Sequence, residues 1–414
     1  MRGKRFSIGL RVTVLAIFIG TVLTASAFAA SEKLLHSFQS NFKDGFYPED
    51  GLIFDDSGNL YGTTFYGGTD GGGTVFELMP KAGGGWKEKV LHNFNDNRRD
   101  GLYPYAGLVF DSLGNLYGTT QSGGAYSYGT VFELSPNAGG GWTEKVLHSF
   151  NYPNAVTPWG GLTIDFSGNL YGTTSASGAY GAGTVFELTP KPGGGWSEKV
   201  LHNFNGSNGK DGASPLAGLV IDGSGNLYGT TDEGGAYVYG TVFELTPKAG
   251  GEWKEKILHS FGGKGDGSNP RAGLIFDGYG NLYGTTSGGG ANVYGTVFEL
   301  TPRAGGRWKE KILHSFIDLD NGAQPVSGLI FDSSGNLYGT TQSGGTYDAG
   351  TAFQLTPKAD GGWAGNVLHN FNDSFGKDGY SPAAGLILDS FGNLYGLTPS
   401  GGIYGYGTVF EIKP

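Results

Sequence analysis

The pentapeptide GNLYG occurs seven times in this chain, with its asparagine at positions 59, 115, 169, 226, 281, 336 and 393. Successive copies lie 54 to 57 residues apart. Such a period is typical of solenoids and propellers, in which each repeat is one supersecondary unit that cannot bury its apolar faces alone. The chain is therefore expected to fold as seven similar units that pack against one another.

Each repeat contains four strand-like runs bounded by turn residues. In the copy at 106–150 these runs are 107–111, 115–120, 129–136 and 144–150. Between the first two, an Asp side chain can accept a backbone N–H two residues on, and a Gly can adopt positive φ, which predicts a tight hairpin. We therefore predict an all-β fold, a seven-bladed β-propeller of four-stranded antiparallel blades.

The two ends of the chain predict how the ring closes. The segment EKLLHSF (32–38) is a fourth strand with no repeat before it, whereas the last repeat stops at GTVFEIKP (407–414) without its own fourth strand. Residues 34–38 are expected to pair with 407–412. We predict a single propeller domain over 31–414, in which residues 32–38 complete the last blade. A linear solenoid would have no use for such a displaced strand.

Residues 1–30 have the three parts of a secretory signal peptide. Four basic residues precede or flank an apolar stretch at 12–23, and Ala-Phe-Ala at 27–29 forms a cleavage site. The apolar stretch is too short to span a bilayer. We predict cleavage after Ala29 or Ala30, no membrane insertion after cleavage, and a secreted location, either extracellular or periplasmic.

Composition narrows the classes of partner. The chain holds 27 basic and 37 acidic residues, a formal charge of −10. Four of the basic and none of the acidic residues lie in the predicted signal peptide, so the formal charge after cleavage is about −14. Such a balance argues against nucleic acid or an anionic membrane as partner. The chain has no cysteine, so its stability depends on a large core and not on disulfides.

The repeated motifs D-x-x-GNLYGTT, the Gly-Gly loop, GTVFELTP and W-x-EK-[VI]-LH-x-F are similar to those of the GloVer tandem-repeat family of exported bacterial proteins. The resemblance covers essentially the whole chain after the predicted signal peptide. It implies an extracellular location. The resemblance implies no particular activity and no catalytic residues.

Candidate ligand-binding residues lie in the eight-residue loop between the second and third strands. The sixth loop position holds Tyr126, Tyr180, Tyr237, Tyr347 and Tyr404, with Asp70 at the same position in the first repeat. An aromatic ring of this kind would suit the stacking of sugars or other flat ligands. The alternative is that these tyrosines fill the gaps between neighbouring blades, because structural positions repeat in every copy.

A catalytic site would have to break the repetition. The main irregularities are Asp232 and Glu233 in the fourth repeat, which are also candidate ligand-binding residues, and Trp159, Arg99 and Arg271 before first strands. A carboxylate pair is what acid–base chemistry on a polysaccharide requires, but adjacent residues in an extended loop diverge. Since no catalytic motif is present, the catalytic residues are unknown and a non-enzymatic role is favoured.

Two repeated sets of residues resemble metal ligands. An Asp-Gly pair precedes the first strand in five repeats, at Asp44, Asp100, Asp211, Asp266 and Asp378, and each fourth strand holds one of the seven histidines. We interpret the Asp-Gly pairs as turns. The histidines lie on the outermost strands, far from one another, and are interpreted as structural. We predict no metal site and no cofactor.

The sequence therefore predicts an exported binding or interaction module, a monomer, whose Tyr- and Gly-rich mouth faces a carbohydrate or a protein partner. A polysaccharide-directed hydrolase or lyase is one alternative. A structural envelope or scaffold protein without a small ligand is the other.

Overall fold

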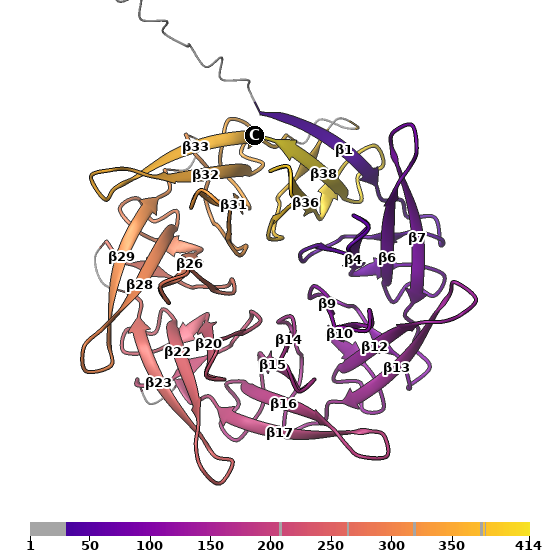
Figure 1. Ribbon diagram of the computed structural model, residues 1–414, viewed down its shortest axis with the longest axis horizontal. Coiled ribbons are helices and arrows are strands. Elements are labelled where there is room, and N and C mark those ends of the chain that lie inside the picture. The colour runs from indigo at the N-terminus through magenta and orange to yellow at the C-terminus, as the bar shows by residue number, and fades with distance from the viewer. Residues whose placement is uncertain (1–29, 207–208, 263–264, 318–319, 373–375, 377) are drawn as a thin grey trace, which may run out of the picture.

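The computed structural model describes residues 30–414 apart from 207–208, 263–264, 318–319, 373–375 and 377. Nearly all of the predicted signal peptide lies outside the described residues. A search of the described part for a helix long and apolar enough to cross a membrane gave none. Seven four-stranded antiparallel sheets surround a central axis as blades (Figure 1). The predicted seven-bladed propeller is confirmed.

Each blade runs from strand A at the axis to strand D at the circumference (Figure 1). From blade one to blade seven, the A strands are β3 (Ile53–Phe54), β9 (Val109–Phe110), β14 (Thr163–Ile164), β19 (Val220–Ile221), β25 (Ile275–Phe276), β30 (Ile330–Phe331) and β35 (Ile387–Leu388). The B strands are β4 (Leu60–Thr64), β10 (Leu116–Thr120), β15 (Leu170–Thr174), β20 (Leu227–Thr231), β26 (Leu282–Thr286), β31 (Leu337–Thr341) and β36 (Leu394–Thr398).

The two outer strands are longer. The C strands are β6 (Thr74–Pro80), β12 (Thr130–Pro136), β16 (Thr184–Pro190), β22 (Thr241–Pro247), β28 (Thr296–Arg303), β32 (Thr351–Pro357) and β38 (Thr408–Lys413). The D strands are β7 (Trp86–Asn93), β13 (Trp142–Ser149), β17 (Trp196–Asn203), β23 (Trp253–Ser260), β29 (Arg307–Ser315), β33 (Trp363–Asn370) and β1 (Ser31–Ser37).

The turn between strands A and B is organised by the aspartate that the sequence singled out. In blade two the Asp111 carboxylate accepts the backbone N–H groups of Leu113 and Asn115, the Asn115 side-chain amide and the Tyr117 hydroxyl. Burial opposes ionisation of Asp111, but these hydrogen bonds outweigh it and lower its pKa. The glycine of this turn, Gly114, has φ of 83°. The predicted tight hairpin is confirmed.

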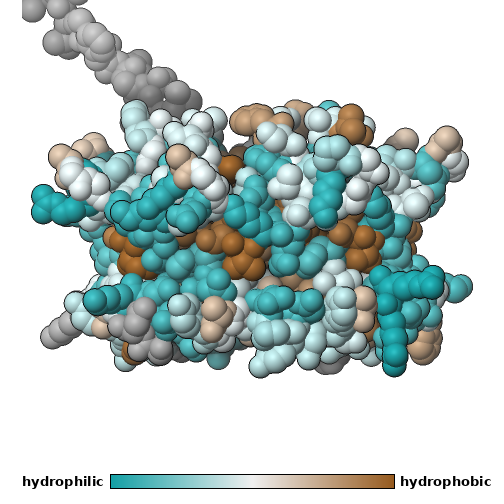
Figure 2. Space-filling view, turned by 90° about the horizontal axis from the view of Figure 1, so that it is seen from below, coloured by the Kyte–Doolittle hydropathy of each residue, from teal (hydrophilic) through white to brown (hydrophobic). Residues whose placement is uncertain are grey.

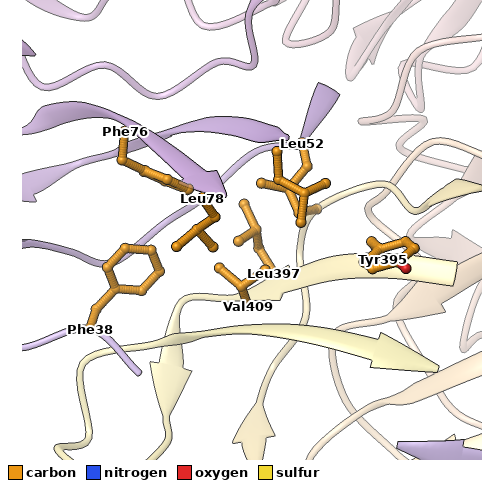
Figure 3. Packing of buried hydrophobic residues seen from close by; sticks show 9 residues of the cluster. Phe38, Leu52, Phe76, Leu78, Tyr395, Leu397 and Val409 are labelled. Atoms are coloured by element: carbon orange, nitrogen blue, oxygen red, sulfur yellow. The ribbon is translucent and has the colours of Figure 1, made fainter. Parts of the chain in front are cut away.

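The apolar core is divided among seven clusters, and each of these packs residues of neighbouring blades together. Figure 3 shows the cluster between blades seven and one, where Leu397 and Val409 face Phe76 and Leu78. Phe38, which follows β1, is fully buried in this cluster. Each blade therefore depends on its neighbours for burial, as expected for a repeat that cannot fold alone.

The N-terminal strand closes the ring. Strand β1 pairs antiparallel with β38, with Leu34 opposite Phe410 and Ser37 opposite Thr408. The Phe38 N–H donates to the Gly407 carbonyl at 3.0 Å. Figure 1 shows β1, the first coloured strand, lying along β38 at the end of the chain. The predicted closure is confirmed, and it joins the two ends by noncovalent contacts alone.

The D-to-A connection and the B-to-C loop lie at the same end of the propeller, because they pair with each other. The pairs are β2 (Gly45–Phe46) with β5 (Tyr66–Gly67), β8 (Gly101–Leu102) with β11 (Ser122–Gly123), β18 (Gly212–Ala213) with β21 (Glu233–Gly234), β24 (Gly267–Ser268) with β27 (Gly288–Gly289), and β34 (Gly379–Tyr380) with β37 (Ser400–Gly401). Blades three and six have a single bridge instead.

The outer wall is seen from the side in Figure 2. Polar residues cover most of the visible surface, and apolar residues gather in a band at mid-height. The part of the wall in view is thus repetitive, as expected from similar D strands.

Candidate functional site

One position of the repeat carries seven different residues. It directly follows the proline of each D-to-A connection and stands two residues before the Gly-Leu pair that leads into strand A. From blade one to blade seven it holds Glu49, Tyr105, Trp159, Leu216, Arg271, Val326 and Ala383, and all seven line one cavity of about 460 Å³ on the axis. We call these seven residues the variable ring.

The fold places the variable ring at the channel mouth for a simple reason. Each member lies shortly before strand A, the innermost strand, so it stands where the chain enters the channel wall. Gln342, from the B-to-C loop of blade six, also lines the cavity. The cavity therefore lies at the end of the propeller where the D-to-A and B-to-C connections meet.

Two aromatic members of the variable ring lie together. The rings of Tyr105 and Trp159, from neighbouring blades, have centroids 4.6 Å apart and planes inclined by 35°. The Trp159 Nε1–H is buried and has no hydrogen-bond partner among the described residues. A buried donor without an acceptor costs about 1–3 kcal/mol. A ligand that accepts this hydrogen bond would remove that cost.

The carboxyl groups at the mouth differ in their roles. Asp50 accepts the backbone N–H groups of Gly51 and Gly107, both at 2.7 Å, so it ties blade one to blade two. Burial, and then the charge of Asp50, raise the pKa of Glu49 to about 7. Burial and these two carboxylates also raise the pKa of Tyr105, an effect that the Arg271 charge opposes. Glu49 is the carboxyl group available to a ligand.

The predicted blade-four carboxylates point apart. Asp232 is 8% exposed and accepts a hydrogen bond from Arg271 Nε at 3.1 Å, which fixes the guanidinium at the edge of the mouth. Glu233 is exposed and lines a second cavity of about 300 Å³ between the B-to-C loops of blades three and four. One residue therefore supports the variable ring and the other faces away from it.

The predicted tyrosines lie on the outer rim of this end. Their exposed fractions are 56% for Tyr126, 63% for Tyr180, 56% for Tyr237, 59% for Tyr347 and 48% for Tyr404. Such exposure argues against the alternative that they fill gaps between blades. Tyr180 lies beside Glu233 in the second cavity. The other four lie one to a blade, and Asp70 is exposed and accepts the Thr69 hydroxyl.

Sequence reasoning drew attention to Trp159 and Arg271 but missed Glu49 and Tyr105 as their partners. The sequence contains a pattern that identifies the variable ring. In all seven copies the ring position is preceded by a proline and followed by a glycine two residues on. A position that varies between repeats while its neighbours stay constant is one at which the fold does not require a particular side chain.

The sequence matches the family described as Gloeobacter/Verrucomicrobia repeat over residues 18–219 and 167–410. The chain belongs to this family. The predicted resemblance is thereby confirmed. No curated protein matches the chain.

Two solved structures with a similar fold are distant in sequence from this chain. One is a candidate 6-phosphogluconolactonase from Bacteroides uniformis, with 14% identity, a TM-score of 0.53, and coverage of 84% of this chain and 89% of that one. Another is an ancestral GH74 enzyme, with 12% identity, a TM-score of 0.55, and coverage of 92% of this chain and 51% of that one. At such identities the likeness of this repeat-family chain to both concerns the fold alone.

Proposed function

We propose that this repeat-family propeller is a carbohydrate-binding module whose ligand enters the cavity lined by the variable ring. The observation that carries the proposal is the Tyr105–Trp159 pair with the buried, unpaired Trp159 Nε1–H. Aromatic faces stack on the apolar face of a sugar ring, and the indole N–H can donate to a sugar hydroxyl. A cavity of about 460 Å³ has the usual size of a small-molecule site.

The charges around the mouth favour a neutral sugar over an acidic one. Arg271 is already paired with Asp232, and Glu49 and Asp50 lie on the same cavity wall. The whole chain is acidic as well, with a formal charge of −10. A uronate or phosphosugar would meet net repulsion here.

The same carboxyl groups favour binding over hydrolysis. A glycosidase needs two carboxyl groups that face each other across the scissile bond. Asp50 is held by two backbone N–H groups and Asp232 by Arg271, while Glu233 faces the second cavity. Glu49 is left as a single carboxyl group that can donate or accept a hydrogen bond.

Export is part of the proposal. A signal peptide at residues 1–30, a chain without cysteine and an acidic composition suit a monomeric protein that meets polysaccharide outside the cytoplasm. Neither a nucleic acid nor a membrane fits this charge.

The test is a screen of neutral oligosaccharides on a glycan array, followed by calorimetry on the best ligand. Trp159→Ala is expected to weaken binding at least about tenfold, equivalent to about 1.4 kcal/mol, because the stacking surface and the N–H donor are lost together. Tyr237→Ala, which removes a large aromatic side chain from the exposed rim, is the control and should bind as the wild type does. A ligand that depends on Tyr237 and not on Trp159 would contradict the proposal.

A further inference from the structure

A group of three potential metal ligands recurs between neighbouring blades. Each group contains a histidine of one D strand, an aspartate of the connection that follows it, and a glutamate of the next blade's D strand. Within the part of the chain that the structure describes, one ligand atom of each residue lies within 4.8 Å of the others in four groups: His36, Asp44 and Glu88; His92, Asp100 and Glu144; His202, Asp211 and Glu255; and Glu32, His369 and Asp378.

In three of these groups the histidine and the aspartate satisfy each other. His92 Nε2 lies 3.0 Å from Asp100 Oδ2, and Asp100 Oδ1 accepts the N–H of Gly101 at 2.7 Å. The groups of His202 and His369 have the same pattern, with His–Asp separations of 3.3 and 2.8 Å and a glycine N–H on Oδ1. In these three groups, hydrogen bonds within the protein therefore satisfy the imidazole Nε2 and the aspartate carboxylate.

The group at the ring closure differs. His36 Nε2, Asp44 Oδ1 and Glu88 Oε1 are all buried and, among the described residues, all without a hydrogen-bond partner. Asp44 is only 5% exposed. Its Oδ2 accepts the N–H of Gln39 at 2.9 Å and lies 3.4 Å from His36 Nε2. These unpartnered atoms belong to three residues whose ligand atoms lie within 4.8 Å of one another.

This donor set has the chemistry of a zinc site. One imidazole nitrogen and two carboxylates are ligands that Zn²⁺ accepts, at about 2.0–2.2 Å and in tetrahedral geometry. The edge of such a tetrahedron is roughly 3.3 Å, and the ligand atoms of the three residues lie within 4.8 Å of one another. We infer that His36, Asp44 and Glu88 bind a divalent cation, Zn²⁺ foremost, with water as the fourth ligand.

The position of the site gives it a structural role. His36 lies on β1 and Glu88 on β7, in the blade that follows the closure. A cation held by both would connect the closing strand to blade one, in addition to the ladder between β1 and β38.

The test uses the purified protein without a polyhistidine tag, equilibrated with Zn²⁺ and then dialysed. Elemental analysis is expected to find one Zn²⁺ per chain. Hydrogen exchange of residues 31–37 is expected to slow roughly 100-fold when free Zn²⁺ is about 100 times its Kd, since the cation binds only the closed strand. Strands far from the closure, such as β20, should be unaffected.

Asp44→Asn is the decisive variant, and it is expected to remove both the bound ion and the added protection. The fold accepts Asn at this place, because Asn321 occupies the equivalent position and contacts His314. Asp100→Asn is the matched control in a group whose histidine and aspartate are satisfied, and it should retain one Zn²⁺. Absence of bound Zn²⁺ in the wild type, or equal loss in the two variants, would overturn the inference. Binding of several ions per chain would also overturn it.

Discussion

Glycine serves two different purposes within one repeat. Gly114, in the turn between strands A and B, has φ of 83° and was expected there. Gly118 lies inside the buried strand β10, and a Cβ at this position would lie 2.6 Å from Cζ of Phe132. The second purpose is close packing, which no turn rule predicts. It became visible only once the partner Phe132 was placed on the neighbouring strand.

Gly118→Ala should therefore destabilise the propeller although alanine is an ordinary strand residue. The added methyl group must displace a buried phenylalanine ring, which costs about 1–3 kcal/mol of unfolding free energy. Gly223→Ala is the control, because a Cβ at that position would have no atom within 4 Å and the φ of Gly223 is not positive; its effect should stay within about 0.5 kcal/mol. Urea unfolding measures both. Equal stability of the two variants would argue against the packing explanation.

The buried glutamates of the D strands make stability depend on pH. Burial, and then the Asp266 charge, raise the pKa of Glu310 from 4.5 to about 7, although His259 acts in the opposite direction. Between these two pKa values the native state binds more protons than the unfolded chain, so the unfolding free energy falls as pH rises. Glu310→Gln should be more stable than the wild type at about pH 8, by about 1 kcal/mol after solvent screening, and equally stable at about pH 4.

Chemical unfolding of both proteins at the two pH values checks this expectation. Glu133→Gln, which changes a carboxylate on strand β12 whose hydroxyl partner is Ser135, controls for the loss of one charge. If the difference in unfolding free energy between the wild type and Glu310→Gln is the same at both pH values, the raised pKa of Glu310 is contradicted.

At the scale of the element, strand β1 is the component on which the ring depends. Removing residues 31–38 would expose the edge of β38 and the apolar surface that Phe38 fills. The truncated protein is expected to aggregate or to unfold at a lower temperature, because an unpaired edge is a site of association. A synthetic peptide of residues 31–38 added in trans should restore the wild-type melting temperature. A truncated protein as stable as the wild type would show that closure contributes nothing.

The elements themselves were predictable where local chemistry decides them. The Asp-and-Gly turns and the alternating runs indicated strands B, C and D close to their observed limits, as at 115–120 against Leu116–Thr120. Strand A was expected over 107–111 but spans only Val109–Phe110, because only these two residues pair with β10, while the Gly107 N–H donates to Asp50 and Asp111 begins the turn to strand B. The small sheets such as β8 with β11 were missed, since Ser122–Gly123 has no strand propensity and its partner lies some 20 residues away.

At the scale of the whole molecule, the sequence drew attention to the end where the D-to-A and B-to-C connections meet, but to a different ring of residues there. The tyrosines of the B-to-C loops repeat in most blades, and repetition drew attention to them. The variable ring lies nearer to the axis, where seven blades contribute seven different side chains to one cavity. Only the closed ring brings Glu49 and Tyr105 next to Trp159 and Arg271, residues that are up to 222 positions apart in the chain.

The tryptophans of this protein offer a direct test of where its ligand binds. Six of the seven lie near the start of D strands, on the circumference, where they pack against core tyrosines, as Trp142 does against Tyr61. Trp159 alone lines the channel cavity within the described residues. After labelling with 5-fluorotryptophan, titration with the oligosaccharide found by array screening should shift one ¹⁹F resonance, the one that Trp159→Phe removes. Saturable binding that leaves this resonance unchanged, or shifts the others instead, would contradict a site at the variable ring.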